Sequence, residues 1–115
     1  MKKAKKYHID FRIWIYTEKD KFLGKGRVEL LERIDKTGSI YNAAKEMKMS
    51  YRQAWQMVKE INERANTPLV EKKLGGKGGG GTFLTEAGKD VITKFHKLQN
   101  KVKTFILEES KKLDL

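Results

Sequence analysis

The sequence predicts an α+β fold, and three observations carry the prediction. Residues 39–65 hold two helical patterns joined by a tight turn, and the second pattern is polar on one side. Residues 69–84 hold two strand patterns around a glycine-rich loop. Residues 85–110 carry an apolar seam with helical spacing. Together they predict a winged helix-turn-helix with an N-terminal strand or β-hairpin and a long C-terminal helix.

Length and charge limit the possible functions. At 115 residues the chain suits one domain with one modest core, so residues 1–115 are predicted as a single domain. It carries 26 Lys+Arg against 15 Asp+Glu, a formal net charge of +11 at pH 7. This excess favours a polyanionic partner, because each neutralised phosphate releases counterions. Solubility alone is the other explanation, but here the charge coincides with a motif that needs it.

Several classes of site find no support in the sequence. The absence of cysteine excludes disulfides, thiolate metal sites and thiol catalysis. His8 and His96 have no companion ligands or nucleophile at a useful spacing, and His96 suits a solvent-facing helical position. No apolar run is long enough to cross a bilayer, and no signal peptide follows the lysine-rich start. We expect a cytoplasmic protein that is not an enzyme, has no cofactor or metal, and has no membrane partner.

The N-terminal region combines a basic tail with a strand pattern. Residues 1–6 are expected either to contact DNA backbone or to make no contact. In residues 7–17, the apolar side chains alternate with His8, Asp10, Arg12 and Trp14, which predicts a half-buried strand. The alternating apolar residues are Ile9, Phe11, Ile13 and Ile15. Phe22 and Leu23 are expected to begin a short return strand.

Two helices follow. Val28, Leu31 and Ile34 share one helical face, which predicts a core helix that Gly38 ends. Ser39 is placed to cap the next helix. The inner stripe of that helix is Ile40, Ala43, Ala44 and Met47. Its small alanines allow a close crossing of the two helices.

The third helix is the predicted recognition helix. After a turn at Lys48-Met49, Ser50 begins a capping box with Gln53. Ala54, Val58 and Ile61 are expected to face the core, Trp55 is favoured as a core residue, and Thr67-Pro68 ends the helix. Tyr51 either joins the core or faces a base or phosphate.

The positions near the start of this helix reach base edges in a helix-turn-helix. Arg52 can present a bidentate fork to guanine, and Gln53 or Gln56 can pair with adenine. Gln53 has a competing use, because the capping box ties it to backbone. The predicted base-reading set is Ser50, Tyr51, Arg52, Gln53 and Gln56. The alternative is three solvated helices in a small bundle, since the helical pattern alone does not separate the two.

The hairpin directly after the recognition helix predicts a wing over the neighbouring minor groove or backbone. Its glycines let backbone N–H groups approach an anion closely. The predicted phosphate contacts are Lys45, Lys59, Lys72, Lys73, Gly76, Lys77 and Gly78. A flexible connector is the alternative, and a small oxyanion ligand stays open. No Gly-Lys-Ser/Thr opens a helix here, so the loop is not a nucleotide-binding P-loop.

The last helix, which Thr85 caps, carries steps of four and three between apolar residues, as in a coiled-coil contact. The seam consists of Val91, Phe95, Leu98, Val102 and Phe105. Spacing alone does not decide between packing on the same domain and packing on a second copy. A homodimer is favoured, because recognition helices act best in pairs one DNA turn apart.

The segments GSIYNAAKEMKMSYRQAWQMVKEIN and PLVEKKLGGKGGGGTFLTEAGKDVI resemble the DNA-binding half of the ModE family of molybdate-responsive regulators. They are more distantly similar to the N-terminal domain of LysR-type regulators. The resemblance covers residues 26–106, and GGKGGGG followed by LTEAG is its most specific part. It implies a winged helix-turn-helix that dimerises through the last helix and binds a palindromic operator.

Two departures from the family matter. Its second, molybdate-binding region has no counterpart in these residues, so the resemblance implies no molybdate site here. Lys48 stands where the family often has glycine, and a positive φ there would cost on the order of 1 kcal/mol.

These observations favour a sequence-specific regulator that binds double-stranded DNA as a homodimer, with its small-molecule effector unknown. The alternatives are an oxyanion-sensing or protein-adaptor module, and a non-specific nucleoid or RNA-binding protein.

Overall fold

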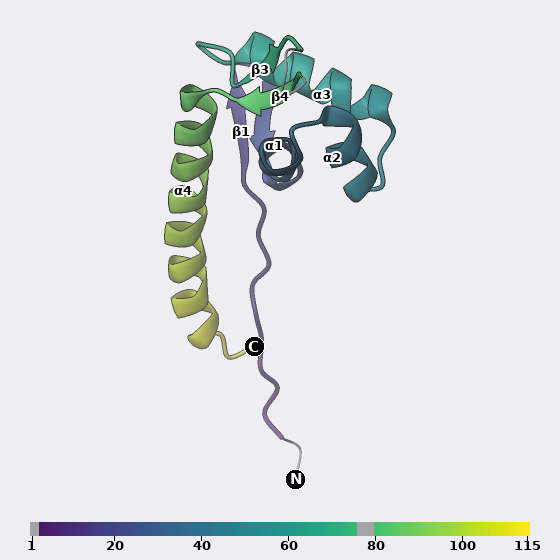
Figure 1. Cartoon of the computed structure of the whole chain (residues 1–115). Helices are drawn as coiled ribbons and strands as arrows, with labels where there is room; N and C mark the ends of the chain where they lie inside the picture. Colours follow the sequence, from purple (N-terminus) through teal and green to yellow (C-terminus); the bar gives the residue numbers. More distant parts are fainter. Residues whose placement is uncertain (1–2, 76–79) are drawn as a thin grey trace.

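The structure, a computed structural model, describes residues 3–75 and 80–115 (Figure 1). Its elements are β1 (Trp14–Thr17), β2 (Asp20–Gly24), α1 (Lys25–Thr37), α2 (Ile40–Glu46), α3 (Tyr51–Arg64), β3 (Val70–Lys73), β4 (Gly81–Leu84) and α4 (Glu86–Lys111). β1 pairs with β2, and β3 pairs with β4, each as an antiparallel two-stranded sheet. This order confirms the predicted α+β winged helix-turn-helix.

The N-terminal strand is shorter than predicted. β1 begins at Trp14, not near Ile9, because its partner β2 ends at Gly24, the residue that pairs with Trp14. Residues 3–13 therefore have no neighbouring strand in the described part of the chain, and they run as an extended arm beside α4 with the opposite chain direction (Figure 1). The predicted alternation survives in burial, since Ile9 and Phe11 are half-buried and Asp10 is exposed.

The predicted helix ends at Gly38 and Ser39 are confirmed, whereas α3 ends at Arg64, before the predicted stop at Thr67-Pro68. Gly38 adopts the left-handed conformation with φ 72°, and its N–H donates to the Ile34 carbonyl at 2.7 Å. The Ser39 hydroxyl accepts the Asn42 N–H and so caps α2. In the turn that joins α2 to α3, Lys48 has φ 56°. This is the strained left-handed conformation expected at a position where the related family often has glycine.

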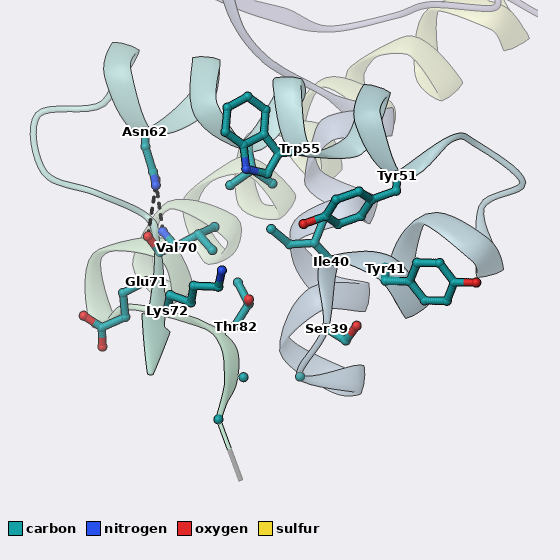
Figure 2. Close-up of a pocket in the computed structure, with 14 residues that line it drawn as sticks. Ser39, Ile40, Tyr41, Tyr51, Trp55, Asn62, Val70, Glu71, Lys72 and Thr82 are labelled. Carbon is teal, nitrogen blue, oxygen red and sulfur yellow. Dashed lines mark hydrogen bonds between the residues drawn. The ribbon is translucent and has the colours of Figure 1, made fainter. Parts of the chain in front are cut away.

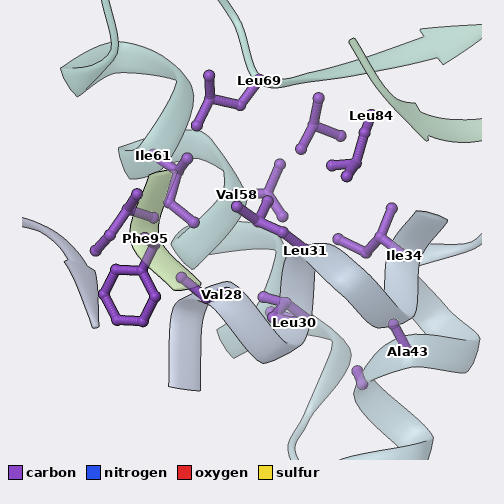
Figure 3. Close-up of a cluster of buried hydrophobic side chains, with 14 residues drawn as sticks. Val28, Leu30, Leu31, Ile34, Ala43, Val58, Ile61, Leu69, Leu84 and Phe95 are labelled. Atoms are coloured by element: carbon purple, nitrogen blue, oxygen red, sulfur yellow. The ribbon is translucent and has the colours of Figure 1, made fainter. Parts of the chain in front are cut away.

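The core surrounds α1, which packs against α2, α3, α4, β2 and β4 (Figure 3). Ala43 and Ala44 are fully buried, and their small side chains let α2 cross close to α1. Ala54, Val58 and Ile61 supply the core face of α3, as predicted. The core therefore holds α3, the predicted recognition helix, along this face, and leaves residues 50–53 at its start exposed.

The apolar seam of α4 divides into two parts. Phe95 is only 2% exposed and belongs to the core of its own domain, and Val91 packs against that core. Leu98 and Phe105 are 42% and 62% exposed. Assigning all five seam residues to a dimer contact was therefore wrong for Phe95, because the domain's own helices already fill the space around the first half of α4. Val102 is half-buried, next to the exposed part of the seam.

Candidate nucleic-acid interface

The start of α3 presents most of the predicted base-reading residues together. The Ser50 hydroxyl accepts the Gln53 N–H at 3.0 Å, which satisfies one unpaired donor of the first turn. Within the described part of the chain, the Gln53 side chain makes no hydrogen bond back to Ser50. A shallow hollow of about 570 Å³ is lined by Ser50, Arg52, Gln53, Gln56, Met57 and Glu60. The exposed side chains of Arg52 and Gln53 are thus available to an external partner.

Gln56 has a partner within its own helix. Its amide Nε2 donates to Glu60 Oε2 at 3.2 Å, while Arg27 Nη2 lies 2.6 Å from Glu60 Oε1. Arg64 Nη1 is 3.5 Å from the same oxygen. These bonds, first that of Arg27 and then that of Gln56, hold the pKa of Glu60 below its ordinary value. Nε2 carries a second N–H, so Gln56 can keep this bond and still present that N–H and its Oε1 to a base.

The wing is attached to α3 by one side chain that the sequence analysis missed. The Asn62 side-chain oxygen accepts the backbone N–H groups of Leu69 and Val70 at 2.9 and 3.1 Å, and its amide nitrogen donates to the Val70 carbonyl at 3.0 Å. An amide can donate and accept at once, so it can satisfy the edge of β3 that does not face β4. An asparagine late in a helix that precedes a strand was the available signal.

The predicted phosphate contacts lie at several places. Lys45 and Lys59 are exposed on α2 and α3. Lys72 and Lys73 follow each other on β3 and so point to opposite faces of the hairpin: Lys72 faces α3 and Lys73 Nζ lies 5.1 Å from the centre of the Phe83 ring. Gly76, Lys77 and Gly78 lie outside the described residues.

An aromatic groove runs between α3, the start of α2 and the β3–β4 hairpin (Figure 2). It has a volume of about 440 Å³, and Tyr41, Tyr51, Trp55 and Lys72 are among its lining residues. The rings of Tyr41 and Tyr51 lie 6.3 Å apart, tilted by 50°. Tyr51, which was grouped with the base-reading residues, therefore lies on the opposite flank of α3 from Gln53.

Trp55 corrects a prediction. It was favoured as a core residue, but it is 46% exposed and lines the aromatic groove. The core face of α3 is narrow and is filled by Ala54, Val58 and Ile61. Trp55 lies one step round the helix from Ala54, on the flank that faces the hairpin. An apolar residue adjacent to a helix's core stripe belongs to the core only where the neighbouring elements reach over it.

Other predicted features lie elsewhere. His96 Nε2 lies 3.3 Å from Glu32 Oε2, and both side chains are exposed. Among residues 3–75 and 80–115, no three metal-binding side chains of the His, Cys, Asp or Glu type come together. No helix in this part of the chain is long and apolar enough to span a membrane.

The family model described as bacterial regulatory helix-turn-helix protein, lysR family, matches residues 26–89. The chain belongs to this family. The matched residues run from the first turn of α1 to the first turn of α4 and include the whole helix-turn-helix and hairpin. The description is that of a regulatory class and not of an enzyme class.

Curated relatives match the same region. The chain is 38% identical over 88 residues to the molybdenum transport protein ModE of Azotobacter vinelandii, which covers 76% of this chain and 33% of that protein. It is 42% identical over 71 residues to the DNA-binding transcriptional dual regulator ModE of Escherichia coli, a match that covers 62% of this chain and 27% of that protein. It is 47% identical over 64 residues to the transcriptional regulator ModE of Haemophilus influenzae, a match that covers 56% of this chain and 25% of that protein. The resemblance is confirmed, and the chain spans about a third or less of these relatives.

Proposed function

We propose that the chain is a transcriptional regulator that binds double-stranded DNA in a sequence-specific way. In this proposal α3 enters the major groove, Arg52, Gln53 and Gln56 contact base edges, and the β3–β4 hairpin lies over the adjacent minor groove. The supporting observation is the polar, exposed start of α3, in a chain that belongs to a family of regulatory proteins. We place the protein in the cytoplasm, because its proposed partner is genomic DNA.

The net charge of +11 supports the same ligand. The lysines that would neutralise phosphates are Lys45, Lys59, Lys72 and, on the other face of the hairpin, Lys73. Of these, Lys45 and Lys59 are on the helix-turn-helix and the other two are on the hairpin. Phosphate contacts position the protein on the duplex, and base contacts select the sequence.

We further propose that the chain acts as a homodimer on a palindromic operator. The exposed seam residues Leu98 and Phe105, with half-buried Val102 between them, support this proposal, because they leave apolar surface of α4 open in the described part of the chain. A two-fold dimer would present two copies of α3, and two half-sites one helical turn apart would then bind together.

The test begins with a duplex that the wild-type chain selects from a random library and a scrambled duplex of the same composition. Arg52→Ala should weaken binding to the selected duplex by about 1–3 kcal/mol and reduce the preference over the scrambled one. Lys45→Ala is the control: it should weaken binding to both duplexes alike and lower the salt slope by about 1. Equal binding of the wild-type chain to both duplexes at every salt concentration would instead indicate non-specific, charge-driven binding.

A further inference from the structure

The aromatic groove lies between the two elements proposed to enter neighbouring grooves of the DNA, α3 and the β3–β4 hairpin. In B-DNA one sugar–phosphate strand separates the major groove, about 12 Å wide, from the neighbouring minor groove. A protein that places a helix in the first and a hairpin over the second must straddle that strand. The surface between α3 and the β3–β4 hairpin is the aromatic groove, so the strand has to cross it if α3 and the hairpin bind as proposed.

The groove is held open before any ligand arrives. The three hydrogen bonds of Asn62 fix the start of β3 against α3, and the Thr82 N–H donates to the Gly38 carbonyl at 3.0 Å, which fixes β4 against the end of α1. Thr82 itself is buried on β4, opposite Lys72 of β3. A site whose walls are set in advance loses less conformational entropy on binding.

The lining chemistry suits an anion with an apolar neighbour. The Tyr51 hydroxyl and the Lys72 ammonium both point into the groove, whereas the carboxylate of Glu71 points away from it (Figure 2). Within the described part of the chain, neither the Tyr51 hydroxyl nor the Trp55 indole N–H has a hydrogen-bond partner. One cation and two donors thus surround a broad apolar ring.

We propose that this groove binds one sugar–phosphate strand of the duplex. Lys72 and the Tyr51 hydroxyl contact a phosphate, and the Trp55 ring packs against the adjoining deoxyribose. The proposal rests on the function proposed above and adds two roles to it. Tyr51 becomes a backbone contact and not a base-reading residue, and Trp55 becomes a DNA contact.

The two tryptophans of the chain provide a matched test. Trp14 and Trp55 are 44% and 46% exposed, and each has a lysine ammonium near its ring, Lys21 at 4.6 Å and Lys59 at 5.7 Å. Trp14, however, lines a separate hollow with residues of the N-terminal arm and Gln99 of α4. Fluorescence of the Trp14→Phe variant reports on Trp55 alone, and fluorescence of Trp55→Phe reports on Trp14 alone.

Titration of Trp14→Phe with the selected duplex should change the Trp55 emission until it saturates. The midpoint of this change should equal the midpoint that fluorescence anisotropy of the labelled duplex gives. Trp55→Phe should show no DNA-dependent change. Trp55→Ala should weaken binding about tenfold to selected and scrambled duplexes alike, because the backbone is common to both. Unchanged Trp55 emission, together with wild-type affinity for Trp55→Ala, would overturn this inference. The proposed function would still stand if Arg52→Ala lost its sequence preference in the same experiment.

A second measurement tests the phosphate contact directly. Single methylphosphonate substitutions remove the charge of one phosphate at a time along the selected duplex. At the phosphate bound in the groove, the neutral linkage should weaken wild-type binding about tenfold, and Lys72→Ala should show no further loss with that duplex. Lys45→Ala is the control, and its loss should add to that of the same linkage. If the loss from Lys72→Ala added fully at every linkage tested, Lys72 would contact no phosphate.

Discussion

Two regions of the molecule differ in how they are held together. The head, residues 14–95, contains every fully buried side chain of the described chain, from Leu23 to Phe95. The stalk, residues 3–13 and 96–115, contains none, although α4 passes through both regions without a break. The stalk projects away from α3, so the C-terminus lies far from that helix (Figure 1). The molecule measures 70 × 30 × 23 Å along its principal axes.

The stalk has contacts of its own, but they are few. The Ile9 N–H donates to the Ser110 hydroxyl at 3.2 Å, and the Tyr7 hydroxyl donates to the Leu115 carbonyl at 3.1 Å. Ile9 and Phe11 are only half-buried. Hydrophobic stabilisation follows the apolar area removed from water, so the head should fold by itself. The stalk should gain its full stability only when a second copy covers the exposed part of its seam.

The largest expected effect separates two phenylalanines on the same helix. Phe95→Ala should lower the free energy of unfolding by about 3–5 kcal/mol, because it leaves a cavity in the core of the head. Phe105→Ala should change it by less than about 0.5 kcal/mol at concentrations where the chain is monomeric, because that ring is 62% exposed. Urea unfolding followed by circular dichroism measures both values. Equal losses would mean that the stalk packs in the single chain as tightly as the head does.

The next effect concerns the point where α4 joins the head. A Cβ at Gly88 would run into the carbonyl oxygen of Leu69, the group that also accepts the Thr85 N–H at 2.9 Å. Gly88→Ala should therefore destabilise the head by about 1–3 kcal/mol. Gly26→Ala is the matched control, since Gly26 also lies in the first turn of a helix and a Cβ there meets nothing within 4 Å. That change should raise stability by about 0.5–1 kcal/mol, and thermal unfolding of both variants would show opposite shifts.

A smaller effect should appear only in assembly. Phe105→Glu places a charge in the exposed seam and should weaken self-association about tenfold or more, with little change in the unfolding of the monomer. Leu107→Glu is the control, because Leu107 is 53% exposed on the same helix but falls outside the four-and-three spacing. Sedimentation equilibrium over a range of concentrations measures both. Equal weakening by the two variants would remove the seam as the dimer contact.

The head was largely predictable from sequence because its signals are local. The caps at Ser39, Ser50 and Thr85 and the left-handed Gly38 depend on hydrogen bonds within a few residues. The core stripes were predictable for a similar reason, because a helix exposes each face at a fixed spacing. The turn at Lys48-Met49 and the hairpin within residues 69–84 were predictable from the residues themselves as well, because glycine-rich and polar breaks separate the helical and strand patterns.

The wrong predictions share one physical cause. Whether a residue is paired or buried depends on which neighbouring element lies over it, and the local pattern does not contain that information. Ile9 has the pattern of a strand but no partner strand, because β2 ends opposite Trp14. Trp55 is adjacent to the core stripe, but none of the described helices and strands covers its ring, which is 46% exposed. Phe95 has the spacing of a seam between two chains, but α1 and α3 of its own chain lie beside it (Figure 3). Spacing identifies a face, and only the tertiary arrangement decides what covers it.

The smallest predicted effect contrasts an ion pair in each region. Arg27 is only 13% exposed and lies 2.6 Å from Glu60, and this contact lowers the pKa of Glu60. A lowered pKa in the folded state means that the pair stabilises the fold above the ordinary value of 4.5, and that this contribution is lost as the pH falls through the folded-state pKa. Glu60→Gln should therefore reduce stability by about 1 kcal/mol at pH 7, and the difference from wild type should vanish in acid.

Glu108→Gln removes an exposed pair with Lys111 in the stalk, at 3.3 Å, and should have almost no effect at any pH. Urea midpoints measured from pH 7 into the acid range test both, and a pH-independent loss for Glu60→Gln would show that its role is packing and not charge.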